Sequence, residues 1–63
     1  MDTKLNEKLN KTLDAVHQRV VAVDAAIWRF ANCEAHEKDA AWVRIGIEGR
    51  FLTAALEALR ALE

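Results

Sequence analysis

The sequence contains no proline, tyrosine or serine, and glycine occurs twice, at Gly46 and Gly49. Proline and glycine are the residues that most disfavour a helix interior, so their scarcity leaves long uninterrupted helices open to this chain. Hydrophobic residues make up 52% of it and charged residues 30%, with alanine, leucine, glutamate, lysine and arginine abundant. This composition is typical of long helices and predicts an all-α protein.

Cysteine is equally scarce, because Cys33 is the single one in the sequence. One cysteine excludes an internal disulfide framework. No apolar run approaches the roughly 20 residues that span a bilayer, and residues 1–8 are too polar for a signal peptide. The formal net charge of -1 gives no general attraction to nucleic acid or to anionic membranes. We therefore expect a cytoplasmic protein with a reduced thiol and no membrane association.

The length of 63 residues leaves little margin for stability. Folding costs on the order of 1.5 kcal/mol of conformational entropy per ordered residue, and small domains offset this cost with disulfides, a metal or oligomerisation. Disulfides are excluded, and no cluster of strong metal ligands is present in the sequence. Oligomerisation is the support that remains, and we expect a homodimer.

Apolar residues in the first half recur at helical spacing. They alternate by three and four positions after Leu13, which is the pattern of a coiled-coil seam. One row of this seam is Leu9, Val16, Val23 and Phe30, and the other is Leu13, Val20 and Ile27. The spacing predicts a first helix over about residues 3–32.

Charged residues interrupt the pattern between Asn32 and Asp39. A continuous helix would place about two turns of charge on its apolar face, so we expect a turn over about residues 33–38 and a second helix over about 39–62. Asn32 is expected to end the first helix in the left-handed conformation. Because neither glycine nor proline marks the bend, a single long helix stays open as an alternative.

The predicted second helix carries two apolar stripes. The first stripe is Trp42, Ile45, Gly49, Leu52, Leu56 and Leu59. A helix that packs against one neighbour needs one stripe, so a second stripe indicates a second neighbour, which in so short a chain is another molecule. We expect this second stripe to form the dimer interface through Val43, Ile47, Phe51, Ala54, Ala58 and Leu62. Residues 1–63 then form one antiparallel helical hairpin that dimerises into a four-helix bundle.

Two residue pairs in or near the second helix call for a packing explanation. Gly46 and Gly49 each cost about 1 kcal/mol relative to alanine inside a helix, so we expect them to accommodate a bulky core residue, or to allow a bend or a close helix crossing at the dimer interface. Trp28 and Trp42 flank the turn and are expected to share an aromatic cluster there. The alternative for Trp28 is an exposed position that binds another protein.

The residues suited to catalysis do not converge in this sequence. Cys33 and His36 have the spacing Cys-x-x-His, but zinc needs four ligands and one chain supplies two good ones. Nucleophilic catalysis by Cys33 would need a positioned base and an oxyanion hole, and neither is indicated. We expect no enzymatic activity, no metal and no cofactor.

Three functions stay open, and binding of a protein partner is preferred. Val21 and Trp28 lie beside the predicted seam and are the candidate residues for binding that partner as a regulator or inhibitor. Lys4, Lys8 and Lys11 form a basic stripe that would favour RNA or DNA phosphates in a nucleic-acid-binding regulator. The third possibility is a purely structural oligomerisation element.

Overall fold

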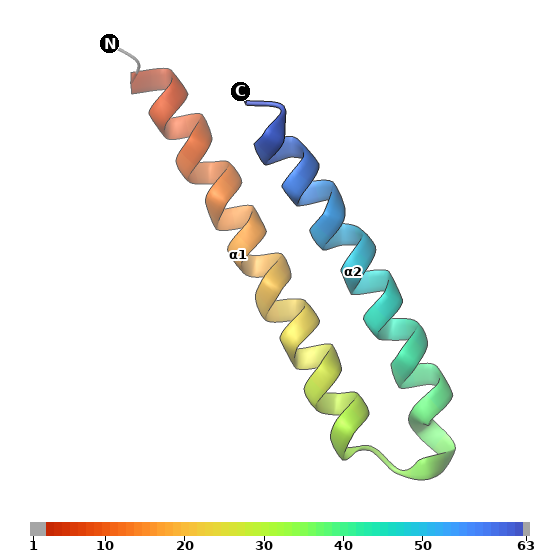
Figure 1. Cartoon of the computed structure of the whole chain (residues 1–63). Helices are drawn as coiled ribbons and strands as arrows, with labels where there is room; N and C mark the ends of the chain where they lie inside the picture. The colour runs from red at the N-terminus through yellow and green to blue at the C-terminus, as the bar shows by residue number, and fades with distance from the viewer. Residues whose placement is uncertain (1–2, 63) are drawn as a thin grey trace.

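The computed structural model describes residues 3–62, which form two long helices joined by a short turn. The first helix, α1, spans Thr3–Asn32, a single 3-10 turn, η1, spans Ala35–Glu37, and the second helix, α2, spans Lys38–Arg60. The helices run antiparallel and lie side by side, with the turn at one end and both termini at the other (Figure 1). The predicted all-α structure with two helices is confirmed, and a single long helix is excluded.

The turn is held by the backbone and carboxylate groups of Glu34 and Glu37. The Glu37 N–H donates to the Glu34 carbonyl at 2.9 Å, and the Glu34 N–H donates to Glu37 Oε1 at 3.2 Å. Such reciprocal bonds satisfy donors that the start of a helix otherwise leaves unpaired. The prediction of a left-handed Asn32 is wrong, because no residue in the described range 3–62 has a positive φ. The side-chain amide of Asn32 instead donates to the Trp28 carbonyl at 2.8 Å.

Lys38, the first residue of α2, closes the C-terminal end of α1. Its ammonium donates a hydrogen bond to the Phe30 carbonyl and lies 4.7 Å from the centre of the Phe30 ring. The last carbonyls of a helix lack intrahelical partners and carry the negative end of its dipole, so a cation is favourable there. One side chain of the charged turn therefore ties the two helices together.

Replacing Lys38 with methionine should lower the free energy of unfolding by about 1 kcal/mol, because methionine keeps the apolar stem and loses the hydrogen bond and the charge. Urea titration followed by circular dichroism, at one fixed protein concentration, measures this loss. Lys11→Met is the control, since Lys11 is exposed and its replacement should change stability by less than about 0.5 kcal/mol. If Lys38→Met and Lys11→Met lower the free energy of unfolding equally, Lys38 does not stabilise the end of α1.

The helices pack through one seam each, in which every residue lies three or four positions from another member. On α1 the buried and half-buried residues are Thr12, Val16, Ala22, Val23, Ala26 and Phe30. On α2 they are Lys38, Ala41, Ile45, Glu48, Gly49, Leu52, Ala55 and Leu59. This spacing keeps one stripe of each helix turned toward the other from the turn as far as Thr12 on α1.

The predicted row of Leu13, Val20 and Ile27 lies outside this seam, and the structure corrects that prediction. These side chains are 45%, 45% and 47% exposed. Their place in the seam is taken by residues one position earlier, the half-buried Thr12 and the buried Ala26. Because Ala26 and the buried Ala41 are both small, the two helices approach closely near the turn. The larger residues of the neighbouring row then remain at the edge of the contact.

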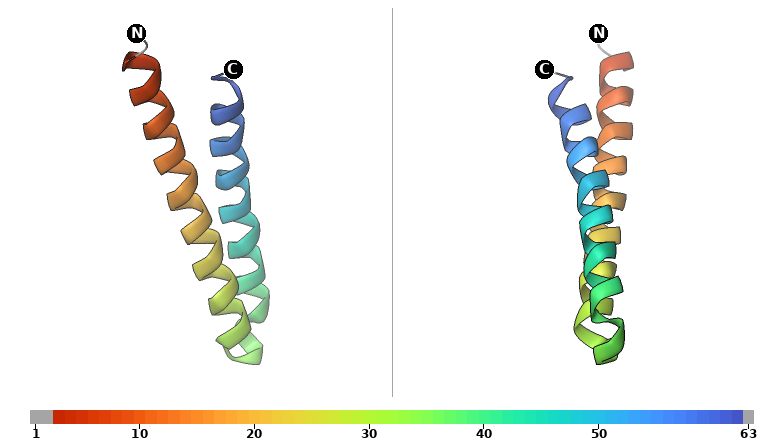
Figure 2. Two further views of the ribbon diagram at one scale, coloured as in Figure 1. Left: turned by 60° about the vertical axis from the view of Figure 1, so that its left-hand side comes forward. Right: turned by 90° about the vertical axis from the view of Figure 1, so that its right-hand side faces the viewer.

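The hairpin is long and only one helix thick. Its Cα atoms extend over 54 × 15 × 9 Å, and their radius of gyration is 15.1 Å, whereas a compact chain of this length would have about 11 Å. The side view shows the two helices overlapping with no further layer on either side (Figure 2). Among residues 3–62, Ala26 and Ala41 alone are buried. Most of the apolar residues therefore stay in contact with solvent.

Candidate interaction surfaces

One broad side of the hairpin carries large hydrophobic residues from both helices, and we name it the apolar side. Its exposed members are Leu9, Leu13, Val20, Ile27, Trp42 and Leu56. Two contacts show that they share a side. The rings of Phe30 and Trp42 lie with their centroids 5.6 Å apart across the seam, and Leu9 and Leu56 line the same groove. The apolar side therefore runs along the whole hairpin.

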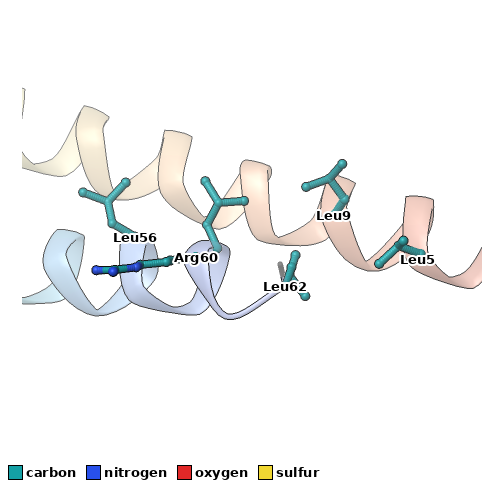
Figure 3. Close-up of a pocket in the computed structure, with 6 residues that line it drawn as sticks. Leu5, Leu9, Leu56, Arg60 and Leu62 are labelled. Atoms are coloured by element: carbon teal, nitrogen blue, oxygen red, sulfur yellow. The ribbon is translucent and has the colours of Figure 1, made fainter.

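At the end near the termini, the apolar side opens into a groove of about 430 Å³. The helices diverge toward this end, which leaves space between their side chains (Figure 2). Leucines from both helices and the stem of Arg60 border the groove (Figure 3). Its lining residues are Leu5, Leu9, Leu56, Leu59, Arg60 and Leu62. The groove is thus a continuation of the apolar side.

The opposite broad side, which we name the charged side, has a different character. Its central hollow is lined by Ala22, Ala25, Ala26, Arg29, Arg44 and Glu48. Arg44 Nε lies 3.1 Å from Glu48 Oε2, and the side chain of Glu48 is 12% exposed. Further along, the Arg19 guanidinium lies 5.0 Å from the centre of the Phe51 ring. The sequence prediction missed Glu48 as a seam residue, although its spacing of four from Arg44 is the signal of a helical ion pair.

The stripe predicted as the dimer interface lies mainly on the outer surface of α2. Val43 and Ile47 are 59% and 41% exposed there, whereas Phe51 is 49% exposed and borders the charged side, where its ring meets Arg19 of α1. Ala54 and Ala58 are exposed as well, whereas Leu62 is half-buried in the groove near the termini. The structure therefore separates Leu62 from the rest of the stripe. The use of these six residues in a dimer stays a prediction.

The two residues predicted to bind a partner lie away from α2. Val21 is 53% exposed and Trp28 is 68% exposed, one heptad apart on α1. The predicted cluster of Trp28 with Trp42 is not formed within residues 3–62, because Trp42 stacks at an angle of 57° against Phe30 instead. The reason is geometric: Trp28 points away from the seam, and Trp42 borders it. Trp28 therefore takes the exposed position that was the alternative prediction.

The basic stripe predicted for nucleic acid is exposed in the first three turns of α1. Lys4, Lys8 and Lys11 all face solvent. Glu7 lies among them, and its spacing of four from Lys11 favours a local ion pair over free positive charge. A phosphate-binding role for these lysines stays an untested alternative.

Cys33 and His36 lie in the turn without converging on a metal geometry. The Cys33 thiol donates to the Phe30 carbonyl at 3.5 Å and is half-buried, whereas His36 is exposed. Within the described residues, no three or more side chains of histidine, cysteine, aspartate or glutamate form a group that would hold a metal ion.

The two glycines of α2 have open space where a side chain would begin. A Cβ atom added to Gly46 or Gly49 would meet nothing within 4 Å. The expectation that they accommodate a bulky residue of the same chain is therefore wrong. Their cost of about 1 kcal/mol each relative to alanine is not offset by any contact within the hairpin. The explanations that remain from the sequence are a bend of α2 and a close helix crossing at a dimer interface.

The shape of the hairpin does not by itself assign a function, since the same fold serves many unrelated functions. No helix in residues 3–62 has the length and hydropathy to cross a membrane. The surfaces described above are thus the basis for inferring what the chain binds. Comparison of the chain with protein-family models, with curated proteins and with solved structures finds no match.

Proposed function

We propose that this chain is a small, non-enzymatic homodimeric module that binds another protein as a regulator or inhibitor. The observation that carries the proposal is its excess of exposed surface. The chain exposes 5236 Å², whereas a compact monomer of 7.1 kDa exposes about 4,100 Å². The excess of about 1,100 Å² is larger than the roughly 800 Å² that each partner buries in a typical stable interface.

The large exposed side chains are distributed over two separate surfaces. Soluble monomers rarely expose large contiguous apolar patches, so an apolar side that runs along a hairpin indicates a binding surface. Trp28 and Val21 lie apart from that side, and an exposed tryptophan is a frequent anchor in protein interfaces. One surface then serves for self-association, and the other is available to a partner.

Capture from a cell lysate tests this function against its alternatives. The tagged chain is incubated with lysate in parallel samples, with and without nuclease. A stoichiometric protein that survives nuclease supports the proposal. A partner that is lost after nuclease, or whose binding falls steeply with added salt, indicates nucleic acid instead, because phosphate contacts release counterions. Absence of any partner indicates a structural oligomerisation element.

Replacing Trp28 with alanine should abolish capture of the protein partner while the mass of the dimer stays unchanged. Truncation of a central aromatic anchor typically costs 2 kcal/mol or more of binding free energy, or about a thirtyfold loss of affinity. Capture yield and light-scattering mass are measured on the same samples. The control replaces Lys4, Lys8 and Lys11 together with glutamate and should leave capture unchanged. If the triple variant loses binding and Trp28→Ala keeps it, the nucleic-acid alternative is favoured.

A further inference from the structure

We infer that the apolar side of the hairpin is the surface through which two copies of this chain pair into a four-helix bundle. The inference rests on the homodimer of the proposed function and names its interface. It differs from the stripe of Val43, Ile47 and Phe51 expected from the sequence, which this pairing leaves uncovered.

The first step is the position of the half-buried residues. Val16, Val23, Ile45 and Leu52 belong to the seams and are still partly exposed, because a hairpin one helix thick covers them from one direction. Each helix of a four-helix bundle contacts two neighbours, and its innermost residues face the bundle axis between them. A second hairpin placed on the apolar side would cover these residues from the remaining direction. The interface inside the hairpin and the interface between hairpins then share one core.

The second step is the contrast between the two broad sides. The apolar side offers leucine, valine, isoleucine and tryptophan at the edges of both seams. The charged side offers alanine with Arg29, Arg44 and Glu48, and one large apolar residue, Phe51, beside Arg19. Burial of these charges under a second hairpin would carry a desolvation cost of several kcal/mol per ion. Only the apolar side supplies burial free energy, at about 25 cal/mol per Å², without that cost.

The third step concerns Gly49, which lies between Trp42 and Leu56 at seven-residue intervals along the same edge of α2. A Cβ atom there would meet nothing within 4 Å in the single hairpin. A glycine between two large side chains makes a notch, and a helix of a second copy can approach closely at that point. The free energy that glycine costs α2 is then offset by a contact outside the chain.

The fourth step identifies the occupant as a second copy. The apolar side is built by both helices over the full length of the hairpin, so its occupant needs two helices of similar length. The excess surface of about 1,100 Å² per chain is sufficient for one standard interface with an identical partner. Two-fold pairing is also the commonest closed assembly of identical chains.

The test compares two neighbouring valines that are similarly exposed in the hairpin. Val20 lies on the apolar side at 45% exposure, and Val21 lies outside it at 53%. Val20→Asp should halve the light-scattering mass at micromolar concentration, from twice 7.1 kDa to 7.1 kDa, because it places an unpaired charge in the interface. Val21→Asp should keep the full mass, as should Phe51→Asp, because Phe51 borders the charged side beside Arg19.

A second measurement leaves the interface intact, in case Val20→Asp unfolds. Trp42 and Trp28 are 65% and 68% exposed in the hairpin. Trp28→Phe leaves Trp42 as the single tryptophan, and Trp42→Phe leaves Trp28. As concentration rises and the dimer forms, acrylamide quenching of Trp42 should fall severalfold, and quenching of Trp28 should not change.

The outcomes separate this interface from the proposed function. If the chain is a dimer but Trp42 stays as accessible as Trp28, the inferred interface is overturned and the homodimer stands. The interface is also overturned if Phe51→Asp dissociates the dimer and Val20→Asp does not, a result that would favour the stripe expected from the sequence. If the chain stays monomeric at all concentrations, the inferred interface and the homodimer of the proposed function are both overturned.

Discussion

The Ile45→Asp variant should lose most of its helical circular dichroism signal at 25 °C. Ile45 lies in the α2 seam beside Glu48, so the new carboxylate would be half-buried next to a like charge. A charge left unpaired in a core costs about 3 to 5 kcal/mol. A domain of this size rarely has more than about 3 to 5 kcal/mol of total stability. The substitution is therefore sufficient to unfold the chain.

Ile47→Asp is the matched control for that variant. The two isoleucines lie in the same helix, two residues apart, but Ile47 is on the outer surface of α2 and is 41% exposed. Its aspartate would be solvated, and Arg50 is three residues further along the helix. The free energy of unfolding should fall by less than about 1.5 kcal/mol, and the helical circular dichroism signal should be retained. If Ile45→Asp and Ile47→Asp lower the free energy of unfolding equally, the side of α2 that faces α1 is not the one that carries Ile45.

The unmodified chain should melt at a temperature that rises by about 6 °C for each tenfold increase in concentration. Unfolding enthalpy is about 0.7 kcal/mol per residue near 60 °C, or about 90 kcal/mol for two chains of this length. A dimer that unfolds to separate chains shifts its midpoint by mass action. Thermal scans by circular dichroism over two decades of concentration measure the shift.

A melting temperature that is independent of concentration would exclude coupled folding and association. Sedimentation at the same concentrations gives the mass directly, with twice 7.1 kDa expected. If the mass is that of one chain and the midpoint is constant, the hairpin is stable by itself, and its exposed apolar residues need another explanation.

The two helices and the turn between them were predictable from the sequence because those features are local. Apolar residues at helical spacing defined both helices, and the charged run from Glu34 to Asp39 marked the interruption. The details of the turn were not predictable in the same way. Which group would satisfy the end of α1 depends on how far Lys38 reaches back to Phe30, and this distance is set by the path of the turn. The sequence prediction used Asn32 instead, since asparagine commonly ends helices.

The larger error of the sequence prediction concerned which side of α1 faces α2. Val16, Val23 and Phe30 belong to the contact in the prediction and in the structure, whereas Leu9 of the same predicted row is 37% exposed and lines the groove near the termini. A second row on either side of it completes a helical stripe, and hydrophobicity alone favours Leu13, Val20 and Ile27. The structure uses the row of Ala26 instead, because small residues allow the helices to approach closely. Periodicity shows that a helix has apolar residues to bury and does not show which neighbour buries them.

The close contact of Ala26 with α2 near the turn, and the divergence of the helices toward the termini, give the hairpin an uneven distribution of local stability. Residues next to the turn are near one another in sequence, so closing the chain there costs the least entropy. Folding by extension from the turn is then the route with the lowest contact order. Backbone amides near the termini, where the helices are furthest apart, are the ones that open most readily to solvent. The end of the hairpin near the turn, where Ala26 and Ala41 are buried, is therefore expected to be its most stable part.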